Sequence, residues 1–95
     1  MKFEWDETKN ELNKRDHKVS FEEASTIFFS NFLEIPDIEH SIEEERFTAF
    51  GISVLKRELF VCYCYREHIN GEEVIRLISA RKASKNEKEE YFYER

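Results

Sequence analysis

The chain has 95 residues, a formal net charge of −6 at pH 7 and 38% charged residues. A chain of this length fits one domain, which we expect to span residues 1–95 and to bury somewhat over ~60% of its unfolded surface. The acidic balance argues against a protein that coats nucleic acid through bulk charge, although it leaves room for a local basic site. With only two Gly and one Pro, the sequence has few of the turn residues that an all-β fold requires.

The N-terminal residues 1–6 are charged from the start and lack the apolar run of a signal peptide. No segment approaches the ~20 apolar residues of a membrane span. Cys62 and Cys64 are two apart on an expected strand, which is poor geometry for a disulfide. The three His are scattered, so no metal-ligand set is apparent. The sequence therefore predicts a cytoplasmic protein with packed free thiols, no metal, no cofactor and no membrane contact.

Two helices are predicted near the N-terminus. Residues 2–5 are typical of a short edge strand, and Asp6 is a good N-cap for a helix over residues 7–17. That helix is polar nearly all round, with few apolar positions beyond Leu12, so it must be held at its ends or by a partner. Ser20-Phe21-Glu22-Glu23 is a capping box that opens a second helix. The apolar face of that helix follows the sequence at helical spacing: Phe21, Ala24, Ile27 and Phe28.

The second half of the chain predicts strands. Residues 33–35 alternate between apolar and polar, and Pro36 confines them to an edge strand or its end. Longer strands are expected over residues 46–52, 58–66 and 74–81, with an Asn-Gly hairpin signal between the last two. A capping box at residues 84–87 opens a terminal helix. The fold class is therefore α+β, with an antiparallel sheet, two N-terminal helices and a C-terminal helix.

The segment Val74–Ala83 is too apolar for a surface strand, yet it carries Arg76 in its middle and Arg81 at its exit. A guanidinium on a buried strand is costly unless an anionic group receives it. The receiver is an internal carboxylate, a partner or a phosphate. Which of these it is decides what the protein does.

The register between the last two strands has two alternatives. A two-residue turn at Asn70-Gly71 pairs Arg76 with Tyr65 and leaves Arg66 on the opposite face. A one-residue bulge instead brings Arg66 opposite Arg76, so that both grip one phosphate. The sequence alone leaves both registers open.

A series of short motifs covers nearly the whole chain in a fixed order. The motifs are Phe3-Glu4-Trp5-Asp6 with Lys9, Val19-Ser20-Phe21-Glu22-Glu23-Ala24, Asp37 with His40-Ser41, Glu44-Glu45-Arg46-Phe47 with Gly51, Cys64-Tyr65-Arg66-Glu67, and Ile75-Arg76-Leu77-Ile78-Ser79-Ala80-Arg81-Lys82-Ala83. In this order and at these spacings the sequence resembles the BrnT family of bacterial toxins, within the wider RelE-like ribonuclease group. Two positions depart from the family pattern: Lys18 stands where a Gly commonly follows the His, and Tyr63 stands where a His is frequent.

The resemblance implies a RelE-like compact antiparallel sheet flanked by helices, with a metal-independent RNA-cleaving or translation-blocking activity. It also implies neutralisation by a small BrnA-like antitoxin of the ribbon-helix-helix type, with DNA bound only through that antitoxin. The departure at Lys18 implies an altered turn between the two helices. The departure at Tyr63 removes one group that would transfer a proton.

RNA cleavage without a metal requires the 2′-hydroxyl to attack the adjacent phosphate in line. One group must accept the 2′ proton, another must donate to the leaving 5′ oxygen, and cations must stabilise the charge that develops on phosphorus. Arginine suits this last role because its planar fork binds two phosphate oxygens and stays charged. Arg76 and Arg81 are the main candidates, with Arg66 in support. The competing interpretation is that these arginines pair with carboxylates and hold the sheet together.

The remaining candidate residues have weaker signals. His40 lies in a polar loop and is a candidate proton shuttle, because histidine is the side chain best suited to exchange protons near neutral pH. Lys9, Ser79 and Lys82 are candidates for substrate binding. Each has a plain alternative: a solvated loop for His40, solubility for Lys9 and packing for Ser79.

Two hypotheses of different classes follow. The first is a toxin of a type II toxin–antitoxin pair, an endoribonuclease that cleaves messenger RNA and arrests translation. The second is a non-catalytic binding module that acts as co-repressor with a ribbon-helix-helix DNA-binding protein. The acidic balance and the departure at Tyr63 favour the second hypothesis modestly, and growth arrest on induction distinguishes the two.

Overall fold

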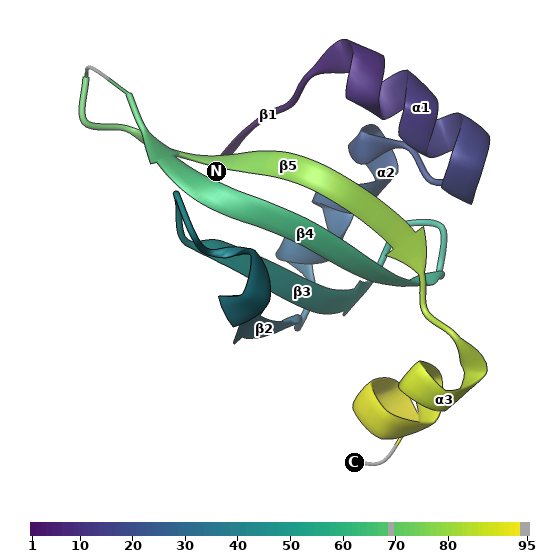
Figure 1. Ribbon diagram of the computed structural model, residues 1–95. Helices are drawn as coiled ribbons and strands as arrows, with labels where there is room; N and C mark the ends of the chain where they lie inside the picture. Colours follow the sequence, from purple (N-terminus) through teal and green to yellow (C-terminus); the bar gives the residue numbers. More distant parts are fainter. Residues whose placement is uncertain (69, 94–95) are drawn as a thin grey trace.

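The computed structural model describes residues 1–68 and 70–93 and has the predicted α+β fold (Figure 1). Its five-stranded sheet has the order β1-β5-β4-β3-β2. The strands are Lys2–Glu4 (β1), Leu33–Pro36 (β2), Arg46–Ile52 (β3), Glu58–Glu67 (β4) and Glu73–Lys82 (β5). β1 runs parallel to β5 and the other pairs are antiparallel, so the sheet is mixed rather than antiparallel throughout. The two short strands lie at the edges, as predicted.

The first helices lie together against one face of the sheet (Figure 1). They are α1 (Glu7–His17), α2 (Phe21–Ser25) and the 3₁₀ turn η1 (Thr26–Phe29). The apolar positions predicted for the second helix are buried against the strands and form the core with Val61, Tyr63 and Leu77. Within the described part of the chain, no helix is long and apolar enough to cross a membrane.

Two buried asparagines hold the polar helix α1 in place. Leu12 is 43% exposed and contributes little, whereas Asn10 and Asn13 are 0% and 7% exposed. The Asn10 carboxamide oxygen accepts from the Phe21 N–H at 2.8 Å. Asn13 donates to the Ala80 carbonyl at 2.8 Å and accepts from the Ala80 N–H at 3.1 Å, as a neighbouring strand would do. Side-chain amides thus replace the apolar stripe that usually fixes a surface helix.

The predicted N-caps all form. The side chains of Asp6, Ser20 and Ser84 each accept the backbone N–H three residues further on. At Ser84 the capping box is complete, because the Glu87 carboxylate accepts from the Ser84 N–H at 2.8 Å. At Ser20 only half of the box forms, because the Glu23 side chain turns towards the sheet instead.

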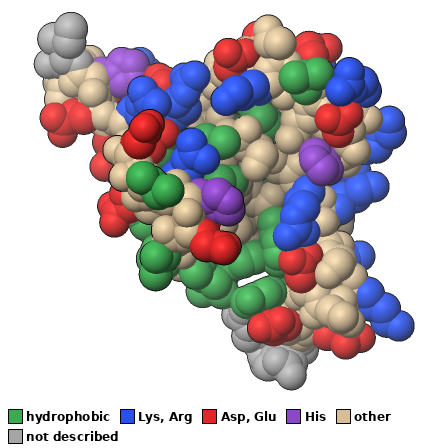
Figure 2. Space-filling view, viewed as in Figure 1, with side chains coloured by type: hydrophobic (Ala, Val, Ile, Leu, Met, Phe, Trp, Pro, Cys, Tyr) green, Lys and Arg blue, Asp and Glu red, His purple; other side chains and the backbone are tan. Residues whose placement is uncertain are grey.

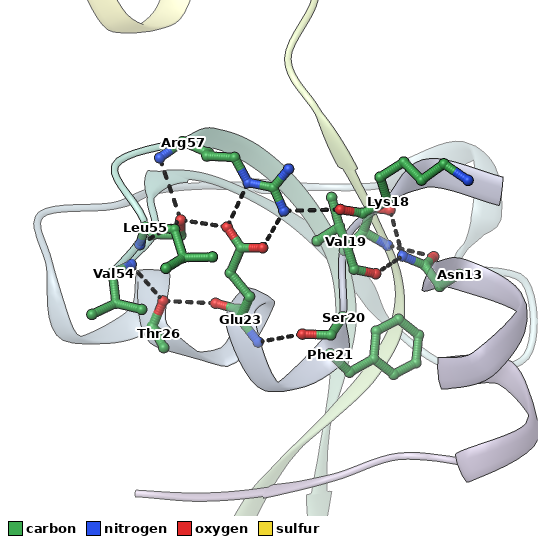
Figure 3. Close-up of polar contacts among 12 residues, drawn as sticks. Asn13, Lys18, Val19, Ser20, Phe21, Glu23, Thr26, Val54, Leu55 and Arg57 are labelled. Carbon is green, nitrogen blue, oxygen red and sulfur yellow. Dashed lines mark hydrogen bonds and ion pairs between the residues drawn. The ribbon is translucent and has the colours of Figure 1, made fainter. Parts of the chain in front are cut away.

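Glu23 and Arg57 form a partly buried ion pair between α2 and the turn that follows β3 (Figure 3). The Glu23 side chain is 6% exposed and accepts from the Arg57 Nε at 2.9 Å and from the Ser53 hydroxyl at 2.6 Å. The hydrogen bond from Arg57 lowers the pKa of Glu23, against the opposing effect of burial. Arg57 also donates to the Lys18 carbonyl at 2.9 Å, so one guanidinium ties both helices to the sheet.

The turn between α1 and α2 keeps a left-handed residue at its start. Lys18 has φ 60°, and its N–H donates to the Lys14 carbonyl at 3.0 Å, which closes α1. The helix ending that glycine most readily forms is therefore made here by a lysine.

A terminal helix covers one end of the opposite sheet face. It consists of α3 (Lys85–Glu87) and the π-helical turn η3 (Lys88–Tyr93). The Tyr91 ring stacks on Phe50 at 4.4 Å between ring centroids, and Phe92 lies 6.3 Å from Phe60 by the same measure. These aromatic side chains are thus partly buried within the chain itself.

The register between β4 and β5 is neither of the two that the sequence left open. Arg76 pairs with Cys64, and Arg66 pairs with Val74. The connection is longer than a two-residue turn, because β4 ends at Glu67 and the Gly71 N–H donates to the His68 carbonyl. Arg66 and Arg76 nevertheless lie on one face, because Arg66 is two residues from Cys64, which pairs with Arg76.

Candidate active site

The sheet face opposite α1 and α2, here called the open face, carries its side chains in rows. Residues that pair directly on neighbouring strands point to the same face. The rows are Glu4, Arg76, Cys64 and Arg46, then Ser79, Cys62 and Thr48, and then Arg81, Phe60 and Phe50. The open face is therefore cationic at one end, small and polar in the middle, and aromatic where the terminal helix covers it.

A β-bulge brings Arg76 and Arg81 to the same face. The two lie five positions apart, and a regular strand would direct them to opposite faces. The register shifts between Cys62 and Tyr63, which leaves Ile78 without a paired residue on β4. Because of this extra residue, the side chains after Ile78 point to the opposite face from the one that a regular strand would give them. Arg76 and Arg81 therefore both point to the open face.

A cavity of about 380 Å³ opens on this face between the strands, the end of α1 and the 3₁₀ turn η2 (Ile38–His40). Figure 2 shows this face, on which His, Lys and Arg side chains gather with Asp and Glu side chains among them. The charged and histidine side chains that line it are His17, Asp37, His40, Arg46 and Arg81. Thr48, Cys62 and Ser79 also line the cavity from the sheet.

His40 is held by a carboxylate at the rim of this cavity. Its Nδ1 lies 3.0 and 3.1 Å from the two Asp37 carboxylate oxygens. The Asp37 side chain is 20% exposed. Ser41 steadies this turn, since its hydroxyl donates to the Asp37 carbonyl at 2.6 Å and accepts the Arg46 N–H at 2.9 Å. With Nδ1 engaged, Nε2 is the ring nitrogen of His40 that remains for a ligand in the cavity.

Arg81 lines the cavity and is bound to the terminal helix. Its two Nη atoms donate to the Glu87 carboxylate at 2.7 and 2.8 Å, the bidentate geometry that arginine favours. The guanidinium carbon lies 4.6 Å from the centroid of the Phe60 ring. The hydrogen bonds from Arg81 lower the pKa of Glu87 from 4.5 to about 2.

Arg76 and Arg66 lie outside this cavity, and each also binds a carboxylate. The Arg76 Nη1 is 2.9 Å from Glu4, and this hydrogen bond lowers the pKa of Glu4. The Arg66 Nη2 is 3.3 Å from Glu44. Arg66 lines a neighbouring hollow of about 580 Å³ that shares Arg46 with the first cavity. An internal carboxylate is therefore the anionic receiver that each of the three candidate arginines has in this structure.

Sequence reasoning missed Arg46, which lines both hollows. Its Nε is buried and has no hydrogen-bond partner among the described residues. Its Nη2 lies 3.9 Å from Glu44, beyond hydrogen-bond distance. Its signal in the sequence is its place in the motif Glu44-Glu45-Arg46-Phe47, which is part of the family resemblance.

Sequence reasoning also missed His17 and Asp37 as cavity residues. His17 is the last residue of α1 and lines the cavity from that side. Its signal was its place in the family pattern, as the His that precedes Lys18. Asp37 precedes His40 by three residues, a spacing that brings side chains together in a helical turn and so offered a usable signal.

The remaining candidates divide between the two faces. Ser79 lines the cavity as a substrate-binding residue would. Lys9 is exposed on α1 and lines none of the hollows described above. Lys82 pairs with Leu59, whose side chain is in the core, so Lys82 belongs to the face that the helices cover.

Tyr63 lies in the core and not at the site. It is fully buried against Phe28, and its hydroxyl donates to Glu34. Tyr65 donates to the same carboxylate at 2.7 Å, and burial followed by this contact raises the pKa of Tyr65 to about 12. The departure from His at position 63 therefore removes no proton-transfer group from the cavity, which corrects the inference drawn from the sequence.

Cys62 and Cys64 are free thiols on the open face. Burial is the main cause that raises the pKa of the Cys62 thiol. Across residues 1–68 and 70–93, no group of three or more His, Cys, Asp and Glu side chains is placed to hold a metal ion.

The α+β fold thus carries a cavity in which two arginines and two histidines lie beside one aspartate. A comparison with protein families matches residues 5–87 to ribonuclease toxins of type II toxin–antitoxin systems. The family is BrnT, and this chain belongs to it. Among curated proteins, the comparison found no match. Membership indicates an RNA target and an antitoxin partner, and the sequence resemblance is confirmed.

Proposed function

We propose that this toxin is a metal-independent endoribonuclease that cleaves messenger RNA and so arrests translation. The observation that supports this best is the convergence in one cavity of His40, positioned by Asp37, with the guanidinium groups of Arg46 and Arg81. The imidazole accepts the 2′ proton, and the arginines stabilise the charge that develops as the 2′ oxygen attacks phosphorus. Ser79, on the same cavity wall, positions a phosphate oxygen.

The arginines retain donors for RNA despite their internal partners. A guanidinium has five N–H groups, and Arg76 uses one nitrogen for Glu4 while Arg81 uses two for Glu87. We assign the scissile phosphate to Arg81 and Arg46, which share the cavity. Arg76 and Arg66 continue the same face and bind neighbouring phosphates of the strand. Lys9 and Lys82 lie away from this path, and we give them no part in it.

The first test is cleavage of a labelled RNA by the purified chain in excess EDTA. The wild type should leave a 2′,3′-cyclic phosphate end, and an Arg76→Ala/Arg81→Ala variant should lose about 10²-fold or more in rate. Because Arg81→Ala also releases the terminal helix, Glu4→Ala/Glu87→Ala is the matched control: it breaks the same ion pairs and keeps both arginines. Equal loss in the control variant would mean that the arginines act through the fold, and intact RNA with the wild type would contradict the proposal.

The antitoxin that we propose is a small BrnA-like protein of the ribbon-helix-helix type. It covers the arginine-bearing face with acidic and apolar side chains, and DNA is bound only through it. Its acidic groups would replace Glu4, Glu44 and Glu87, the internal carboxylates that now receive these arginines. Co-expression of the neighbouring gene product should give a complex that protects RNA and binds promoter DNA. A toxin that purifies alone beside its neighbour would contradict this.

The second candidate function is a non-catalytic co-repressor module. The ion pairs of Arg66, Arg76 and Arg81 favour it, because an arginine already bound to a carboxylate is explained by its structural role. Induction in a bacterial host separates the two functions. An inert module should be expressed without harm, whereas a ribonuclease should arrest growth, and Arg76→Ala/Arg81→Ala should relieve the arrest.

A further inference from the structure

A second imidazole lines the cavity from the side opposite to the rim that holds His40. His17 ends α1, which packs on β5, while His40 ends η2, which precedes β3. Both line the 380 Å³ cavity, together with Arg46 and Arg81. The third histidine, His68, follows β4 and contacts Glu4 at 3.0 Å, and it does not line this cavity.

The end of α1 that carries His17 is fixed to the strand that carries Arg81. Asn13, one turn before His17, is bound to both backbone groups of Ala80 at 2.8 and 3.1 Å. The Lys18 carbonyl, one residue after it, accepts from Arg57. His17 thus projects from a backbone that is tied on both sides, which is the support that a reacting group needs to stay in position.

We propose that His17 is the general acid of the cleavage reaction and His40 the general base. His40 takes the base role because Asp37 holds its Nδ1 and stabilises the imidazolium that forms when Nε2 accepts a proton. The inference rests on the proposed ribonuclease function and deepens it, because it supplies the second proton-transfer group that metal-free cleavage requires.

The 2′ oxygen loses its proton to neutral His40 and forms a bond to phosphorus, while the bond from phosphorus to the 5′ oxygen breaks. Protonated His17 gives its proton to that leaving oxygen, and Arg46 and Arg81 hold the non-bridging oxygens. The products are a 2′,3′-cyclic phosphate and a free 5′-hydroxyl, and exchange with water restores both imidazoles.

The test compares two substrates that differ in the leaving atom. With ordinary RNA, His17→Gln and His40→Gln should each lose about 10²–10⁴-fold in rate. With an RNA whose 5′ leaving oxygen is replaced by sulfur, no proton is needed on departure. There His17→Gln should come within about tenfold of the wild type, while His40→Gln should stay slow. His68→Gln is the matched control and should cleave both substrates like the wild type.

The acid role of His17 and the ribonuclease function can be contradicted separately. A His17→Gln variant that cleaves ordinary RNA normally, or that stays slow on the sulfur substrate, overturns the acid role while the ribonuclease function stands. Intact RNA with the wild type contradicts that function itself. The site is then tested by titration with a 2′-deoxy dinucleotide, which is not cleaved. Shifts in the ring resonances of His17 and His40 but not of His68 support the paired site, and their absence overturns it.

Discussion

Lys18 has a left-handed backbone conformation, which is sterically unfavourable for a residue with a Cβ atom. It holds φ at 60°, which costs a residue with a Cβ about 1–2 kcal/mol relative to a right-handed conformation. The turn keeps this geometry because the Lys18 N–H closes α1 and its carbonyl accepts from Arg57. The substitution of a glycine-favouring position by lysine therefore leaves the turn in place and lowers its stability.

Lys18→Gly should raise the free energy of unfolding by about 0.5–1 kcal/mol, because relief of the strain exceeds the greater freedom of glycine in the unfolded chain. Urea denaturation followed by Trp5 fluorescence measures the change. Lys14→Gly, one turn earlier inside α1, is the control and should cost about 1 kcal/mol. Equal destabilisation by both variants would show that the left-handed residue stores no strain.

At the scale of elements, the terminal helix is attached to the open face by ion pairs and aromatic contacts, and Lys88 adds a contact with Glu58 at 3.9 Å. Arg81 holds Glu87, and Tyr91 and Phe92 pack over Phe50 and Phe60. The attachment depends on an ionised Glu87, whose pKa is lowered to about 2 by Arg81. Since the folded pKa lies below 4.5, the pair stabilises the fold above about pH 4.5 and loses that effect as the pH falls towards 2.

Glu87→Gln should therefore lower the free energy of unfolding at pH 7 by about 1 kcal/mol, a value reduced for solvent screening at a partly exposed pair. The difference from the wild type should fall by more than half at pH 3, because Glu87 then gains its proton on unfolding. Denaturation curves of both proteins at the two pH values measure this. A difference that is constant with pH would mean that the ion pair does not stabilise the helix.

Local signals predicted most of the elements. The caps at Asp6, Ser20 and Ser84 and the apolar spacing of the second helix involve residues within a few positions of one another. What fixes α1 is not local: Asn13 binds the backbone of Ala80, 67 positions later. A helix that is held by asparagine side chains shows no periodic spacing of apolar residues in its sequence. The sequence therefore predicted the helix and not its anchor.

The candidate site was predicted to a similar extent. His40, Ser79 and Arg81, chosen for their chemistry, line one cavity in the structure. Arg46 and His17 were missed as cavity residues because strand pairing and a helix end bring them there, and the signal of each was only its place in the family pattern. The roles of all five in catalysis stay predictions.

At the scale of the whole molecule, polar contacts join the helical layer to the sheet. The apolar core lies between the layers, but the link between α2 and the turn after β3 is Glu23 with Arg57 (Figure 3). Removing one partner of a buried pair leaves the other charge without compensation, which is more costly than removing both. The Glu23 side chain is 6% exposed and would bear that cost.

Arg57→Met should lower the free energy of unfolding by about 3 kcal/mol, because it leaves the Glu23 carboxylate with only the Ser53 hydroxyl as donor and removes the donor to the Lys18 carbonyl. The double variant Glu23→Met/Arg57→Met should recover part of that loss. Thermal denaturation of the single and double variants measures the coupling. Additive losses would show that the two side chains contribute independently.

Because Ile78 is an extra residue in β5, the faces to which the side chains of this strand point depend on how many residues the strand has. A chain shortened by Ile78 alone would still alternate correctly, with Leu77 directed to the core and Ser79 to the open face. A chain shortened at Ala80 would turn Arg81 inwards and empty the cavity of its guanidinium. We therefore expect β5 to tolerate a deletion at one position and to lose its function through the same deletion two positions later.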